Sequence, residues 1–141
     1  MAATAEPIRR VGLHPLHAML LAGVFPPFLG ALLSDIAYAN SHQIQWQNFA
    51  SWLIVGGLVF CAITLVFAIA GLFRRGRGGR GWLHALLVLA TFACGFLAAL
   101  VHARDAWAMM PAGPLLSGLA TLLALAAIWS GFARDRVGGV R

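Results

Sequence analysis

The sequence has little charge and no lysine. Of its 141 residues, 10% are charged and 61% are hydrophobic, and all ten basic residues are arginines. A soluble domain of this size carries roughly a quarter charged residues. The chain therefore has too little polar surface to cover a water-soluble globule, and we predict an integral membrane protein that contacts the lipid bilayer.

Cysteine is scarce as well. Cys61 and Cys94 are the two cysteines, each deep in an apolar run and neither in a C-x-x-C or C-x-x-C-H pattern. This spacing indicates neither a zinc site nor c-type haem attachment, and isolated buried cysteines usually act as small apolar side chains. Hydrolytic chemistry also has little support, because G-x-S-x-G, H-E-x-x-H and P-loop patterns are missing.

Four apolar runs are long enough to cross a bilayer, which takes roughly 20 residues of helix. They cover about residues 16–38, 49–73, 82–103 and 113–133, separated by polar, arginine-glycine and proline-containing stretches. We therefore predict an all-α fold, a four-helix membrane bundle that forms one domain over residues 1–141. Pro26 and Pro27 lie inside the first run and predict a kink there.

The arginines predict the orientation of the bundle. With four spans, nine of the ten arginines fall on one side of the membrane and only Arg104 falls on the other. The positive-inside rule then places both termini and the middle loop in the cytoplasm. Because the arginines form short clusters beside apolar spans, the net charge of +6 indicates membrane topology. We expect no nucleic-acid partner.

Ionisable side chains inside a membrane are costly and usually face the interior of a bundle. Several such side chains lie close to the predicted span ends and therefore need an explanation. The cytoplasmic end has His14, His17 and His84; the outer end has Asp35, His102 and Asp105, with His42 in the outer loop.

The spacing of these residues predicts two polar levels. His84 and His102 are eighteen residues apart, as are His17 and Asp35. Eighteen residues make five turns of α-helix, so each pair shares one helical face, with its members roughly 27 Å apart. Each of the two helices thus presents one polar group near each membrane surface.

One interpretation is a haem b held without covalent attachment by imidazoles from two facing helices. The iron ligands would be His17 and His84, with His14 as an alternative ligand and His102 with His42 as a weaker outer pair. Small residues such as Gly95 would leave room for the macrocycle, and arginines would pair with its propionates.

Two other interpretations remain open. His14, His17 and His84 would suit zinc or copper, although Pro15 lies between the first two and no carboxylate or thiolate completes the set. Alternatively, the chain is a non-catalytic membrane subunit whose histidines and Asp35 form hydrogen bonds within the bundle or contact a partner protein, a quinone or a lipid.

The segment HPLHAMLLAGVFPPFLGALLSDIAY (14–38) resembles the opening of a bacterial family of small predicted membrane proteins of unknown function. The matching positions are His14, Pro15, His17, Phe25, Pro26 and Asp35, and a histidine at the start of the third span matches His84. An asparagine common in the family shortly after that histidine is replaced by apolar residues. The resemblance implies four helices and a redox association, because relatives often occur near periplasmic quinoprotein sugar dehydrogenases.

Together these patterns predict an electron-transfer or accessory subunit of the bacterial inner membrane rather than a stand-alone enzyme. It would bind haem b and pass electrons between a periplasmic dehydrogenase and the quinone pool, with a partner protein or a second copy of itself in the membrane. The alternative is a structural or anchoring subunit of a larger complex.

Overall fold

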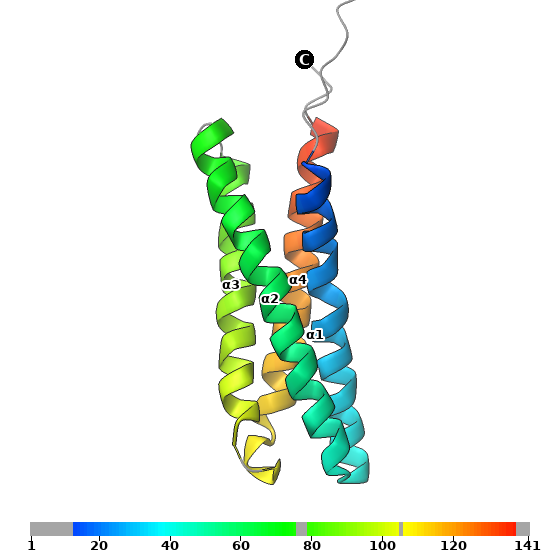
Figure 1. Ribbon diagram of the computed structural model, residues 1–141. Helices are drawn as coiled ribbons and strands as arrows, with labels where there is room; N and C mark the ends of the chain where they lie inside the picture. Colours follow the sequence, from blue (N-terminus) through cyan, green and yellow to red (C-terminus); the bar gives the residue numbers. More distant parts are fainter. Residues whose placement is uncertain (1–12, 76–78, 105, 138–141) are drawn as a thin grey trace, which may run out of the picture.

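Four long helices form the molecule (Figure 1). The computed structural model describes residues 13–75, 79–104 and 106–137, and no strand occurs among them. The helices are α1 (Pro15–Ser41), α2 (Ile44–Arg75), α3 (Gly79–His102) and α4 (Ala112–Val137), with a short 3₁₀ helix, η1 (Ala106–Met109), before α4. The predicted all-α bundle is confirmed.

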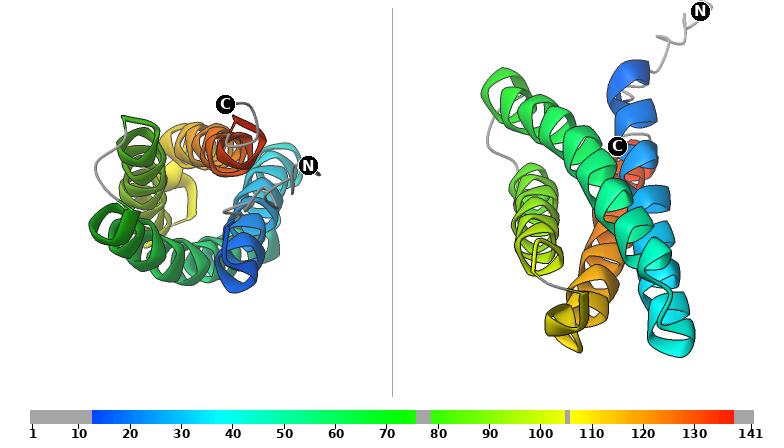
Figure 2. Two further views of the ribbon diagram at one scale, coloured as in Figure 1. Left: turned by 90° about the horizontal axis from the view of Figure 1, so that it is seen from above. Right: turned by 60° about the horizontal axis from the view of Figure 1, so that its bottom comes forward.

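The helices surround a common axis in chain order (Figure 2). Helices α1 and α3 each pack against both α2 and α4, so α1 and α3 face each other across the diagonal of the bundle. The start of α1, the end of α2, the start of α3 and the end of α4 lie together at what we call the terminal end (Figure 1). The α1–α2 and α3–α4 connections lie at the opposite end, the hairpin end.

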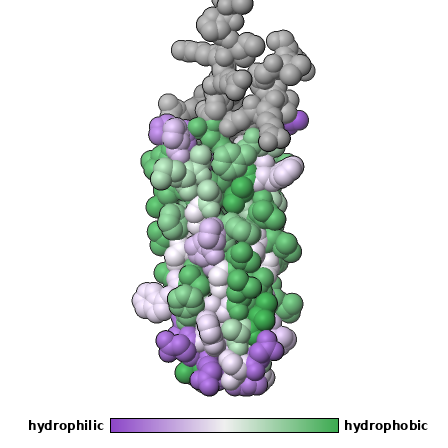
Figure 3. Space-filling model, turned by 90° about the vertical axis from the view of Figure 1, so that its right-hand side faces the viewer, coloured by the Kyte–Doolittle hydropathy of each residue, from purple (hydrophilic) through white to green (hydrophobic). Residues whose placement is uncertain are grey.

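The outside of the bundle is apolar, as a lipid-facing surface requires. All four helices have the length and composition to cross a membrane. Large apolar side chains point outward, and Trp52, Phe73 and Trp129 are more than three-quarters exposed, at 76%, 81% and 77%. Figure 3 shows one face, on which hydrophobic side chains cover most of the middle and hydrophilic ones gather at the hairpin end. The chain is a multi-pass membrane protein.

The α1–α2 connection is shorter than the polar stretch 39–48 suggests. Helix α1 continues to Ser41, and His42 ends it in the left-handed conformation, at a φ of 57°, with its N–H donating to the Tyr38 carbonyl. Helix α2 then begins at Ile44. The Ser41 hydroxyl donates to a carbonyl of its own helix, which shows how a polar residue completes the last turn of α1.

Helix α1 continues through Pro26 and Pro27 without interruption. Two glycines lie on either side of this proline pair and let α2 come close. A Cβ atom on Gly23 would lie 3.0 Å from the Phe60 ring, and one on Gly30 would lie 3.0 Å from Leu53. Neighbouring helices can hold a proline-containing membrane helix in this way, and the predicted kink stays a prediction.

The Phe28 side chain fills the centre of the bundle. It is fully buried, and its ring reaches from α1 to glycines on two other helices. A Cβ atom would lie 3.1 Å from this ring on Gly57 of α2, and 2.7 Å from it on Gly95 of α3. The suggestion that Gly95 leaves room for a macrocycle is therefore wrong, because Phe28 occupies that space.

A leucine in place of Gly95 should destabilise the bundle. The new side chain would overlap Phe28 and Leu58, and overpacking of this kind costs about 1–3 kcal/mol. The matched control is Gly56→Leu, because a Cβ atom on Gly56 meets nothing within 4 Å. Both exchanges improve helix propensity equally. Thermal unfolding in detergent, followed by circular dichroism, should show a lower midpoint for Gly95→Leu alone; equal midpoints would contradict the packing described here.

Candidate functional site

His17 of α1 and His84 of α3 meet inside the bundle, near the terminal end. Their Nε2 atoms are 3.4 Å apart, and both side chains are buried. The two ring centroids are 5.6 Å apart and the ring planes are inclined by 41°. The contact crosses the diagonal, so the two rings approach each other in the interior rather than on a shared helix surface.

The HPLH stretch explains why one histidine enters the bundle and the other does not. His14 is the N-cap of α1, and its Nδ1 accepts a hydrogen bond from the Leu16 N–H. Pro15 follows at the first helical position, where its fixed φ suits a helix start. His17 lies one turn further on, on the buried face that continues through Leu21. His14 is exposed and stays away from the buried pair.

A serine on α4 contacts His84. The Ser130 Oγ lies 3.0 Å from His84 Nδ1 and also donates to the Ala127 carbonyl at 2.8 Å. When the hydroxyl proton points to the Ala127 carbonyl, Oγ accepts a hydrogen bond from Nδ1–H. The unprotonated Nε2 atom of a neutral His84 then faces His17. We call His17, His84 and Ser130 the histidine layer.

The histidine layer is packed tightly on one side and adjoins a pocket on the other. A Cβ atom on Gly131 of α4 would lie 2.6 Å from Leu21 and 3.2 Å from His84, so a larger residue there would require both side chains to shift. On the other side, between α2 and α3, an apolar pocket of about 310 Å³ is lined by Leu72, Trp82 and Ala85, among others. Ala85 directly follows His84, so the pocket reaches the level of this layer.

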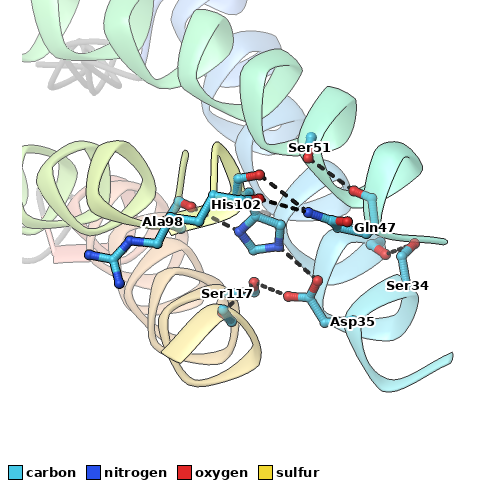
Figure 4. Close-up of polar contacts among 10 residues, drawn as sticks. Ser34, Asp35, Gln47, Ser51, Ala98, His102 and Ser117 are labelled. Carbon is cyan, nitrogen blue, oxygen red and sulfur yellow. Dashed lines mark hydrogen bonds and ion pairs between the residues drawn. The ribbon is translucent and has the colours of Figure 1, made fainter. Parts of the chain in front are cut away.

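A second polar cluster lies toward the hairpin end (Figure 4). The His102 Nε2 is 2.8 Å from Asp35 Oδ1, and the Ser117 hydroxyl on α4 donates to Asp35 Oδ2 at 2.5 Å. All three side chains are buried. We call Asp35, His102 and Ser117 the carboxylate layer. As in the histidine layer, α1 and α3 supply the titratable pair and α4 supplies a serine.

Both ring nitrogens of His102 are engaged. Its Nδ1 donates to the Ala98 carbonyl at 2.8 Å, while Nε2 faces Asp35. Gln47 of α2 donates to the carbonyls of His102 and Arg104, each at 3.4 Å, and so satisfies the end of α3. A carbonyl accepts only, so Nδ1 carries a proton, and the contact with Asp35 requires a second shared proton.

The proposed outer ligand pair of His102 and His42 does not form. His42 is exposed and stacks on Trp107, with centroids 5.0 Å apart and planes inclined by 20°. The reason is that Asp35 already occupies His102 Nε2, and the left-handed cap places His42 outside the bundle. Asp105 lies outside the described residues.

The zinc or copper interpretation is not supported by the geometry. Among residues 13–75, 79–104 and 106–137, no three His, Cys, Asp or Glu side chains converge as metal ligands. Of His14, His17 and His84, His14 does not join the other two, because it caps the start of α1.

Sequence reasoning missed Gln47, Ser117 and Ser130. A signal for the first two was present, because each continues a stripe of buried positions at helical spacing. On α2 this stripe is Gln47, Ala50, Ile54, Cys61, Thr64 and Ala68; on α4 it is Ser117, Ala120, Ala124 and Ala127. A polar residue on such a stripe must find a partner inside.

The described geometry can be compared with known proteins. A family model described as "Predicted membrane protein (DUF2231)" matches residues 13–141. The chain belongs to this family. The match takes in all four helices and both polar layers of this DUF2231 protein. No curated protein and no solved structure is significantly similar to it.

Removing the carboxylate of this DUF2231 protein should strongly destabilise it. Asp35→Ala leaves His102 buried without its counter-charge, which costs about 3–5 kcal/mol of unfolding free energy. His102→Ala should cost a similar amount, whereas the double variant should cost clearly less than the sum, because neither charge is then left alone. Reversible unfolding in mixed detergent measures all three. Strict additivity would show that the two side chains are not coupled.

Proposed function

We propose that this protein is a membrane electron-transfer subunit that holds haem b between His17 and His84. The observation that carries the proposal is the 3.4 Å approach of two Nε2 atoms across the diagonal of the bundle. Two imidazoles from facing helices are the donor set for a haem iron with two histidine ligands.

The donor set fits this group closely. Imidazole nitrogens bind metal ions at about 2 Å, and the two Nε2 atoms, 3.4 Å apart, would hold an iron after a small rotation of the rings. If Ser130 accepts from Nδ1–H, the Nε2 lone pair of His84 is available to the iron.

Room beside the rings comes from small side chains and from the α2–α3 pocket. Ala68 and Ala85 are buried at this level of the bundle, and Ala85 also lines the apolar pocket of about 310 Å³. The imidazoles do not line this apolar pocket, so the side chains between them and the pocket would have to move to admit a flat, largely hydrophobic macrocycle.

The protein would position and tune the group rather than react itself. Bound haem would supply reversible uptake of one electron. Ser130 fixes the ring orientation of His84, and a hydrogen bond accepted from the far nitrogen makes a histidine a stronger ligand. The low polarity around the layer and the orientation of both rings would keep the coordination unchanged between oxidation states, which favours fast electron transfer.

We further propose where the protein acts in the cell, from its arginine distribution and from what the family resemblance implies. The terminal end, beside the arginine-rich segments, would face the cytoplasm of a bacterium, and the chain would act between a periplasmic dehydrogenase and the quinone pool.

The purified protein should show the reduced-minus-oxidised absorption spectrum of a b-type haem. His17→Ala and His84→Ala should each abolish the α-band because each removes an axial ligand. The matched controls are His42→Ala and His14→Asn, which alter exposed histidines; asparagine also preserves the helix cap. Both controls should retain the band.

Two results would contradict the proposal. A protein made in cells with ample haem but purified without any would favour a structural subunit instead. A band that survives in both His17→Ala and His84→Ala would show that other residues hold the haem.

Orientation can be tested separately with cysteine labelling. A cysteine at Ser41, exposed at the hairpin end, should react with a membrane-impermeant maleimide added to intact cells. One at Arg80, exposed near the terminal end, should react only after the cells are opened. The native Cys61 and Cys94 are buried and give little background. The reverse pattern would overturn the proposed orientation.

A further inference from the structure

The proposed function leaves the carboxylate layer without a role. Asp35 is fully buried and His102 is 4% exposed, and both belong to helices that can cross the membrane. Ionisable groups in such a place are costly and commonly bind or relay protons. The question is whether the hydrogen bonds of this layer permit a change in proton number.

When Asp35 and His102 share one proton, every hydrogen-bonding group of the carboxylate layer has a partner. His102 carries protons on both ring nitrogens and donates to Ala98 and Asp35. The Asp35 carboxylate accepts the second hydrogen bond from Ser117. In this state the layer is a buried ion pair with no net charge.

The same positions of the heavy atoms also accommodate one more proton. The Ser117 hydroxyl has two acceptors within reach: Asp35 Oδ2 at 2.5 Å and the Gly113 carbonyl at 2.9 Å. If Oδ2 becomes protonated, it donates to Ser117 Oγ, and the hydroxyl proton turns to Gly113. His102 still donates to Oδ1, so no hydrogen bond is lost.

The groups around the layer allow the extra proton to leave again. Tyr38 lies one turn beyond Asp35 on α1, Gln47 of α2 is a neutral amide, and Arg104 follows α3 on the exposed surface. Within the described part of the chain, no second acid faces the layer. The added proton therefore brings an uncompensated charge, which burial disfavours, so its binding is reversible.

We propose that the carboxylate layer is a reversible proton-binding site that exchanges with the aqueous phase at the hairpin end. Uptake converts the Asp35 carboxylate to a carboxylic acid by adding one proton to Oδ2; no electron moves and no other bond breaks. The water is close, because Asp35 lies six residues before the end of α1, about 9 Å along the helix, and His102 is the last residue of α3.

Infrared spectroscopy on labelled full-length protein tests this directly. Asp105→Asn with Asp135→Asn leaves Asp35 as the sole aspartate, so ¹³C-labelled aspartate then reports on it alone without altering the layer. As the pH is lowered from neutral through the range in which the protein stays folded, one labelled carboxylate per chain should convert to a carboxylic acid, and the change should reverse when the pH is raised. A labelled carboxylate that stays ionised throughout this range, or a carboxylic acid that never loses its proton, would overturn the proposal.

Two serine variants test the switching hydroxyl. In Ser117→Ala the protonated Asp35 has no acceptor, so its C=O stretch should move to the higher frequency of a carboxyl without a hydrogen bond. Ser34→Ala is the matched control, because this buried serine also donates to the carbonyl four residues earlier but does not contact Asp35. A frequency unchanged in both variants would refute the role given to Ser117.

Discussion

Every buried polar group in a membrane bundle must find its partner within the protein, because lipid offers none. Asp35 meets this requirement through one contact to α3 and one to α4. The described residues include no buried side-chain nitrogen or oxygen atom without a hydrogen-bond partner. The paired carboxylate thus fixes how three helices are rotated and how far each is shifted along the bundle.

That fixed register extends to the other end of the molecule. Helices α1 and α3 run in the same direction, and the residues paired across the diagonal are 67 positions apart in both layers. A shift of one turn in either helix would break both pairs at once. Helix α4 adds to this constraint, since Gly113 lies against His102 and Gly131 against His84, eighteen residues apart. A larger side chain at either glycine would crowd the histidine beside it.

Sequence reasoning could predict the spans and the two polar levels. The eighteen-residue spacing placed His17 with His84 and Asp35 with His102 at matching depths, because α-helical periodicity depends only on position along the chain. It could not pair Asp35 with His102, which depends on helices α1 and α3 lying on a diagonal. The partners on α4 were missed for the same reason.

The sequence also did not predict where the helices begin and end. Nothing in the HPLH sequence distinguishes its two histidines, yet His14 caps the helix and His17 enters the core. The polar stretch 39–48 looked like a loop, but most of it is helical, and Gln47 points inward to satisfy the end of α3. For His14 a local hydrogen bond decided the outcome, whereas Gln47 bonds to a residue 55 positions away, and neither kind of bond leaves much trace in hydropathy.

The buried Phe28 ring lies between the histidine layer and the carboxylate layer and separates them. Hydroxyl groups in this middle region, on Thr64, Thr91 and Thr121, all donate to carbonyls of their own helices. The described residues therefore offer no continuous hydrogen-bonded wire from one polar layer to the other. A proton bound by the carboxylate layer, as we propose, would therefore have to return to the surface from which it came, because these threonines do not pass it on toward the histidine layer.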